Sequence, residues 1–84
     1  MTQRDPYRFV YLDEMGHLWS ADREKLHSFA RSINLKPEWF QDRPVLYHYD
    51  LTTYTKRAYA RASGAVTITS REMVGLMRNA VLRS

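Results

Sequence analysis

The side chains of this sequence that could do chemistry fall into three groups, far apart along the chain. The groups are Asp13, Glu14 and His17; His48 and Asp50; and Thr69, Arg71 and Glu72. Imidazoles and carboxylates can transfer protons or bind metal ions, and a guanidinium binds anions. A fold that brought the three groups together would therefore form a polar site for an anion or a cation.

The motifs of well-known enzyme classes are missing from the sequence. It has no cysteine, and its three glycines form no nucleophile elbow, Walker loop or dinucleotide-binding turn. The spacing of His48 and Asp50 is too common to identify a metal site. We therefore predict no cofactor and no bound metal, and the sequence leaves open whether the chain is an enzyme.

Each polar group also has a structural explanation. Thr69 and Glu72 match a capping box, in which the glutamate carboxylate accepts a hydrogen bond from the threonine amide at the start of a helix. Asp50 can orient His48 or cap the helix that follows it. Asp13 can simply be a solvated turn residue. These explanations remain beside the functional ones.

The apolar pattern predicts three strands, each followed by a helix. The expected strands are residues 8–12, 45–49 and 66–68, and the expected helices are residues 21–33, 53–63 and from 69 onward, with a short turn at 37–41. This alternation predicts an α/β fold, a small three-stranded, mainly parallel sheet with three helices in the order β-α-β-α-β-α. The alternative for the first strand is antiparallel pairing at an edge. Ligands bind at the carboxyl ends of parallel strands, so the three polar groups should share that edge.

The composition indicates one globular domain over residues 1–84, with its core at about 8–82. Hydrophobic residues make up 44% of the chain and charged residues 26%, and no run suits a signal peptide or a membrane span. Small secreted domains usually need disulfides, so we expect a cytoplasmic protein without membrane contact. A chain this short also often forms a homodimer to bury spare surface.

Positive charge is concentrated in the second part of the chain. Residues 51–84 hold six lysines and arginines but one glutamate, and the whole chain has a net charge of +4. Such a basic segment can attract nucleotides, nucleic acids or acidic protein surfaces, or it can be the solvated face of ordinary helices. The free amides and the dipole at the start of the last helix would add to the binding of an anion.

Several short motifs follow one another along nearly the whole chain. They are His17-Leu18, Leu26-His27-Ser28-Phe29-Ala30, Trp39-Phe40-Gln41, His48-Tyr49-Asp50, Lys56-Arg57, Gly64-Ala65-Val66 and Thr69-x-Arg71-Glu72-Met73. Over about residues 8–80 their order and spacing resemble the bacterial and phage domain-of-unknown-function family 4031. The resemblance implies no activity, but its polar motif positions indicate candidate ligand-binding residues. These are His17, His48, Asp50, Lys56, Arg57, Arg71 and Glu72.

The leading hypothesis is a small binding domain for a phosphate-bearing ligand, either a nucleotide or a nucleic acid. Its basic residues would be Lys56, Arg57 and Arg71, beside the histidines. One alternative is a metal-dependent hydrolase or nuclease, in which Asp13, Asp50 and Glu72 hold a hard divalent ion such as Mg²⁺. The other alternative is a regulator, phage-encoded or not, that binds a protein partner.

Overall fold

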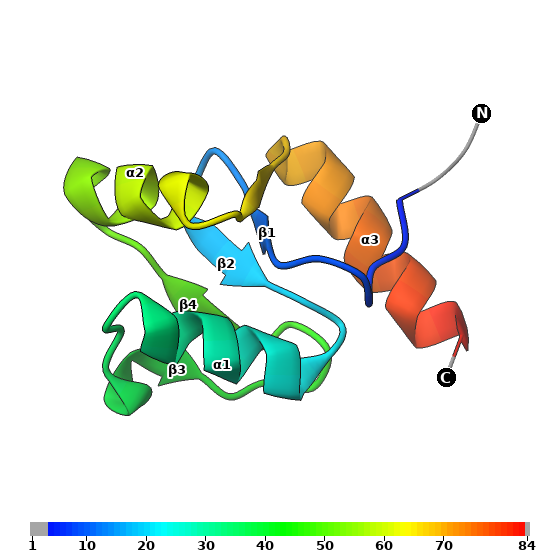
Figure 1. Cartoon of the computed structure of the whole chain (residues 1–84). Coiled ribbons are helices and arrows are strands. Elements are labelled where there is room, and N and C mark those ends of the chain that lie inside the picture. The colour runs from blue at the N-terminus through cyan, green and yellow to red at the C-terminus, as the bar shows by residue number, and fades with distance from the viewer. Residues whose placement is uncertain (1–3, 84) are drawn as a thin grey trace.

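The computed structural model describes residues 4–83 and shows helices arranged around a small sheet (Figure 1). The strands are β1 (Tyr11–Leu12), β2 (His17–Trp19), β3 (Phe40–Gln41), β4 (His48–Asp50) and β5 (Val66–Thr67). The helices are α1 (Arg23–Ser32), the short 3-10 helix η1 (Pro37–Trp39), α2 (Tyr54–Ala62) and α3 (Ser70–Arg83). The three α-helices lie close to the residues predicted for them. Within the described residues, no helix combines the length and the apolarity that crossing a bilayer requires.

The sheet of the described chain has five strands in the order β3-β4-β2-β1-β5 and is mixed. The pairs β1 with β2, β2 with β4 and β3 with β4 are antiparallel, and the pair β1 with β5 is parallel. The predicted three-stranded, mainly parallel sheet is therefore wrong. The sequence predicts neither β2 nor β3, because β2 begins at the polar His17 and β3 lies within the short turn expected at 37–41.

A tight turn after β1 reverses the chain and makes this part of the sheet antiparallel. Asp13 Oδ1 accepts hydrogen bonds from the amides of Met15 and His17, at 3.0 and 2.9 Å. Gly16 has a φ of +90°, and a Cβ at this position would lie 2.5 Å from the backbone oxygen of Leu51. The turn therefore needs glycine, and it returns the chain alongside β1 as β2.

Side-chain caps and buried stripes explain where the first two helices form. Asp22 caps α1 and Thr53 caps α2, each by accepting a hydrogen bond from the amide three residues later. Leu26 and Ala30 are buried on α1, and Ala60 is buried on α2. Each of these helices is therefore defined by a polar cap at its N-terminus and by an apolar face that packs on the core.

The two faces of the sheet carry different side chains. Leu18 of β2 lies opposite Tyr49 of β4, and His27 of α1 hydrogen-bonds the Tyr49 hydroxyl, so α1 covers this face. His17 lies opposite Asp50, and both point to the other face because side chains alternate along a strand. Residues of α3 line a pocket together with His17, so α3 lies over this second face. The large fully buried core side chains include Trp19, Tyr11, Leu12, Leu18, Leu26 and Leu51.

Candidate functional site

His17, His48 and Asp50 lie together on the second face of the sheet. The antiparallel register of β2 and β4 puts His17 opposite Asp50, and the strand period of two puts His48 on the same face. The imidazole rings meet edge to face with their centroids 4.9 Å apart. Each of the three residues offers a ligand atom within 4.8 Å of the other two. The register of two inner strands therefore assembles the cluster.

Both imidazoles converge on one carboxylate oxygen. Asp50 Oδ1 lies 3.2 Å from His48 Nε2 and 3.7 Å from His17 Nε2. The side chains of Asp50 and His17 are 44% and 39% exposed, and that of His48 is 16% exposed. The cluster is therefore partly open to solvent.

A hydrogen bond to Nδ1 of each histidine, on the side of the ring away from Asp50, determines which ring nitrogen is free to bind an ion. His48 Nδ1 lies 2.7 Å from the carbonyl oxygen of Leu46, and His17 Nδ1 lies 2.9 Å from Asp13 Oδ2. A carbonyl and a carboxylate can only accept, so Nδ1 of each neutral ring carries the hydrogen and Nε2 keeps its lone pair. Two lone pairs then face the Asp50 carboxylate. Lone pairs and a carboxylate that face one another repel, and a cation bound between them removes this repulsion.

Asp13 is the buried anchor of this arrangement. Its side chain is 3% exposed, with one oxygen on the amides of Met15 and His17 and the other on the His17 ring. The carboxylate set of the hydrolase hypothesis, Asp13 with Asp50 and Glu72, is thus not the set that clusters. Asp13 positions His17 rather than offering itself as a ligand.

Two imidazole nitrogens and one carboxylate oxygen form a ligand set that suits a transition-metal ion. Catalytic zinc sites use three such ligands at about 2.0–2.2 Å and keep a further position for water or substrate. Ligands at that distance in a tetrahedral site lie about 3.3 Å from one another, close to the 3.2 and 3.7 Å found around Asp50 Oδ1. Mg²⁺ prefers sites made of oxygen ligands alone. The His17, His48 and Asp50 set therefore differs from the three-carboxylate Mg²⁺ site expected from the sequence.

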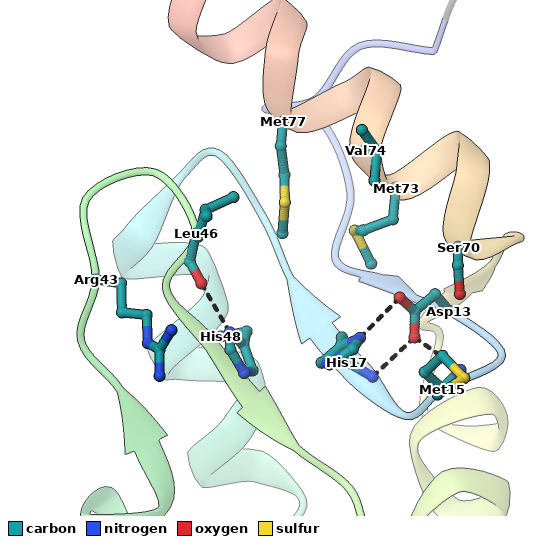
Figure 2. Close-up of a pocket in the computed structure, with 10 residues that line it drawn as sticks. All are labelled: Asp13, Met15, His17, Arg43, Leu46, His48, Ser70, Met73, Val74 and Met77. Atoms are coloured by element: carbon teal, nitrogen blue, oxygen red, sulfur yellow. Dashed lines mark hydrogen bonds and ion pairs between the residues drawn. The ribbon is translucent and has the colours of Figure 1, made fainter.

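A pocket of about 290 Å³ lies between this face of the sheet and α3. Figure 2 shows His17 and His48 along its lower side, with α3 above them. Its apolar lining consists of Met15, Leu46, Met73, Val74 and Met77, and its other lining residues are Asp13, Arg43 and Ser70. A ligand in this pocket would therefore contact apolar side chains and lie next to both imidazoles.

Two polar residues of this pocket are not singled out by the sequence. Arg43 lies in the loop between β3 and β4, where its position just before the strand that carries His48 is the signal that could have found it. Ser70 Oγ is buried, and it has no hydrogen-bond partner in the part of the chain that the structure describes. A buried hydroxyl without a partner is rare in proteins and calls for an explanation.

Lys56 and Arg57 are not lining residues of this pocket. The Lys56 ammonium lies 4.2 Å from the centre of the Trp39 ring, in a cation–π contact. Arg57 donates hydrogen bonds to the carbonyl oxygens of Leu51 and Met15, at 2.7 and 3.1 Å. Arg57 therefore supports the cluster from outside by holding the β1–β2 turn against the segment after β4.

Arg71 and Glu72 lie at the start of α3 and do not line the pocket either. Glu72 and Thr69 exchange hydrogen bonds of 3.0 Å between side chain and amide, so the predicted capping box is confirmed. Glu14 accepts a further bond, of 3.1 Å, from the Ser70 amide. The carboxylates of Glu72 and Glu14 thus already accept hydrogen bonds from the amides at the start of α3 that a phosphate would need. Arg71 lines a separate groove with Val74, Gly75 and Arg78.

Burial raises the pKa of the two tyrosines that flank His48 in the sequence. Desolvation is the largest cause for both Tyr47 and Tyr49, and it favours the neutral phenol. The Tyr47 hydroxyl donates a hydrogen bond of 2.7 Å to the Ser20 carbonyl, and Tyr49 pairs with His27. Both tyrosines therefore support the strand that carries His48.

Residues 5–80 match the family model described as Protein of unknown function (DUF4031). The chain belongs to this family. The family resemblance predicted from the motifs is thereby confirmed, and the whole histidine cluster lies within the matched segment. No curated protein and no solved structure matches the chain. The family description assigns no activity, so the chemistry of this family member is inferred from its site.

Proposed function

We propose that the chain is a metal-dependent hydrolase domain that binds a divalent transition-metal ion, such as Zn²⁺, through His17, His48 and Asp50. One observation carries the proposal: both Nε2 atoms converge on one carboxylate while both Nδ1 atoms are held by acceptors. Metal-binding histidines usually donate their other ring N–H to a carboxylate or a carbonyl. This cluster has one of each, from Asp13 and Leu46.

Three protein ligands leave room for chemistry on the ion. Structural zinc sites use four protein ligands, whereas catalytic sites use three and keep an open position. Both imidazoles line the pocket, and the cluster is partly exposed, so solvent and a ligand could reach a bound ion. Such an ion activates water near neutral pH and polarises a carbonyl, which supports hydrolysis of an ester or amide bond.

A zinc titration of the purified chain tests the metal site. The sequence has three histidines, and His27 lies outside the cluster, which makes it a matched control. Loss of a group that hydrogen-bonds a metal ligand, without itself binding the metal, reduces metal affinity roughly 10–100-fold. His17→Gln and His48→Gln remove a ligand itself, so we expect them to reduce zinc affinity by more than this. His27→Gln keeps all three ligands, and its amide can still hydrogen-bond the Tyr49 hydroxyl, so it should bind zinc as the wild type does. Equal zinc affinity of the wild type and His48→Gln would overturn the proposal.

Turnover of an activated ester tests the reaction class separately. We expect the zinc-loaded chain to hydrolyse para-nitrophenyl acetate faster than the chelator-treated chain, which should keep only the slow metal-independent reaction of its nucleophilic side chains. His48→Gln should also lose the activity, because it loses the ion. Tight zinc binding without turnover would remove the hydrolase assignment and leave a metal-binding domain.

A second candidate function, binding of a nucleic acid or another phosphate-bearing ligand, has one supporting observation. Arg71 and Arg78 line the same groove of α3, about two helical turns apart. We expect labelled single-stranded DNA to bind the chain more weakly as salt rises, and the double variant Arg71→Gln/Arg78→Gln to lose binding in fluorescence anisotropy. An affinity that salt does not change would contradict this function. Binding to a protein partner and formation of a homodimer remain predictions from the sequence.

A further inference from the structure

We propose that the pocket beside the histidine cluster binds a small amphipathic carboxylate, with its acidic head on Arg43 and its apolar tail against α3. Its role as a substrate rests on the proposed function, whereas its binding does not require a metal ion. Three features of the pocket carry the inference: its apolar lining, the positive charge of Arg43, and the order of these groups along the pocket.

The lining offers apolar surface that a ligand tail can cover. Met15, Leu46 and Val74 are 64%, 53% and 56% exposed although they line a pocket. Covering such surface removes apolar area from water, which favours binding. Met73 and Met77 complete the wall from α3, and methionine side chains adapt to tails of different shape.

Arg43 supplies a positive charge from an anchored loop. Arg23 pairs with Asp42 at 3.0 Å, and Trp19 Nε1 donates a hydrogen bond of 3.0 Å to the Val45 carbonyl, so the loop is held on both sides of Arg43. Among the described residues, Arg43 itself has no hydrogen-bond or ion-pair partner. Its guanidinium is therefore available for a bidentate bond to a carboxylate.

The order of these groups along the pocket indicates how the ligand lies. Figure 2 shows Arg43 at the end beside His48, Met73 and Met77 of α3 above the imidazoles, and Asp13 with Met15 at the opposite end. An acid held by Arg43 would extend its tail over both rings, and Asp13 would repel a second acidic group. The volume of about 290 Å³ is at the lower end of ligand pockets, which run from about 300 to 1,000 Å³. The pocket thus suits one small acid.

Binding of a series of fatty acids to the zinc-free chain tests the inference. Butanoate, hexanoate and octanoate can be titrated by calorimetry or NMR, with octanamide as the uncharged comparison. We expect affinity to rise about fourfold for each methylene that the pocket buries. Octanamide should bind at least about tenfold more weakly than octanoate, because it lacks the charge-assisted bond.

Two matched variants decide whether the binding occurs in this pocket. Arg43→Gln should reduce octanoate binding to that of octanamide, whereas Arg61→Gln, on the exposed side of α2, should change nothing. Met77→Gln should flatten the dependence on chain length. Octanoate affinity that is equal in the wild type and Arg43→Gln, or that does not depend on chain length, overturns the inference.

Separate zinc titrations keep this test distinct from that of the metal site. Arg43→Gln retains all three proposed metal ligands, so its zinc affinity should equal that of the wild type. Zinc binding without octanoate binding leaves the metal proposal and removes the carboxylate pocket. If octanoate binding needs Arg43 but the chain binds no zinc, the carboxylate pocket stands and the metal proposal is removed.

Discussion

The replacement of Asp13 by asparagine tests whether an outer hydrogen bond prepares His17 to bind a metal ion. The carboxylate accepts from His17 Nδ1 at 2.9 Å, which leaves the Nε2 lone pair free. An asparagine oxygen can still accept the amides of Met15 and His17, but its NH₂ group then faces the imidazole. His17 Nδ1 must now accept, so the hydrogen moves to Nε2 and blocks the ligand atom.

The size of the effect follows from these three hydrogen bonds. Outer partners of metal-binding histidines contribute roughly 10–100-fold to metal affinity, which equals about 1.4–2.8 kcal/mol. Two of these three bonds keep their direction in Asp13→Asn, and the third reverses. We therefore expect the free energy of unfolding of the zinc-free chain to fall by no more than about 1–2 kcal/mol, so the variant stays folded.

Competition with a chromogenic chelator measures the zinc affinity, and heteronuclear NMR of the imidazoles reports which ring nitrogen carries the hydrogen. We expect Asp13→Asn to weaken zinc binding and to move the His17 hydrogen to Nε2, while His48 keeps its hydrogen on Nδ1. Glu38→Gln removes the same charge from an exposed side chain of η1 and should leave both readouts unchanged. A folded Asp13→Asn chain with zinc affinity within about threefold of the wild type, and with the His17 hydrogen still on Nδ1, refutes the reasoning.

Three further changes test the local physics of the fold. Gly16→Ala should cost about 2–3 kcal/mol in urea unfolding, and clearly more than Gly64→Ala, because both have positive φ but only the Gly16 Cβ meets backbone, at Leu51; equal losses would contradict this. Burial raises the pKa of Tyr47 above 10.0, so the unfolded chain loses this proton first, and the stability that the phenol contributes should decline as pH rises above about 10. Tyr47→Phe should lessen that decline when urea midpoints are compared across alkaline pH, and an unchanged decline would argue against the buried phenol as its source. Ser70→Ala should leave the free energy of unfolding unchanged or raise it by about 0.5 kcal/mol, since its buried hydroxyl has no partner among the described residues; a loss above about 1 kcal/mol would reveal a partner.

The helices of this chain are readable from its sequence, and the topology of its sheet is not. Caps such as Thr69 with Glu72 and stripes such as Leu26 with Ala30 act over three or four residues, within reach of a local pattern. The turn between β1 and β2 is local as well, since Asp13 accepts the amides of Met15 and His17 and Gly16 has a positive φ. The pairing of β1 with β5 and of β2 with β4 instead joins segments more than 30 residues apart, which no local pattern marks.

The sequence does indicate the residues of the histidine cluster, although for a reason that the fold does not bear out. The sequence predicts that His17, His48 and Asp50 lie together because the carboxyl ends of parallel strands share one edge of a sheet. They meet because the start of β2 lies opposite the end of β4 in an antiparallel pair. The basic residues do not follow the same logic, since Lys56 and Arg57 contact an aromatic ring and backbone carbonyls.

The two walls of the pocket are held in place by different kinds of contact. The histidines and Asp50 lie on β2 and β4, which are inner strands, whereas α3 follows β5, an edge strand of two residues. Met73, Leu76 and Ala80 of α3 are buried in the core, so apolar packing rather than strand pairing holds this wall in place. A shift of α3 would change the width of the entrance, while the three ligand atoms on β2 and β4 kept their spacing. Release rates should therefore respond to substitutions under α3 that leave metal affinity untouched.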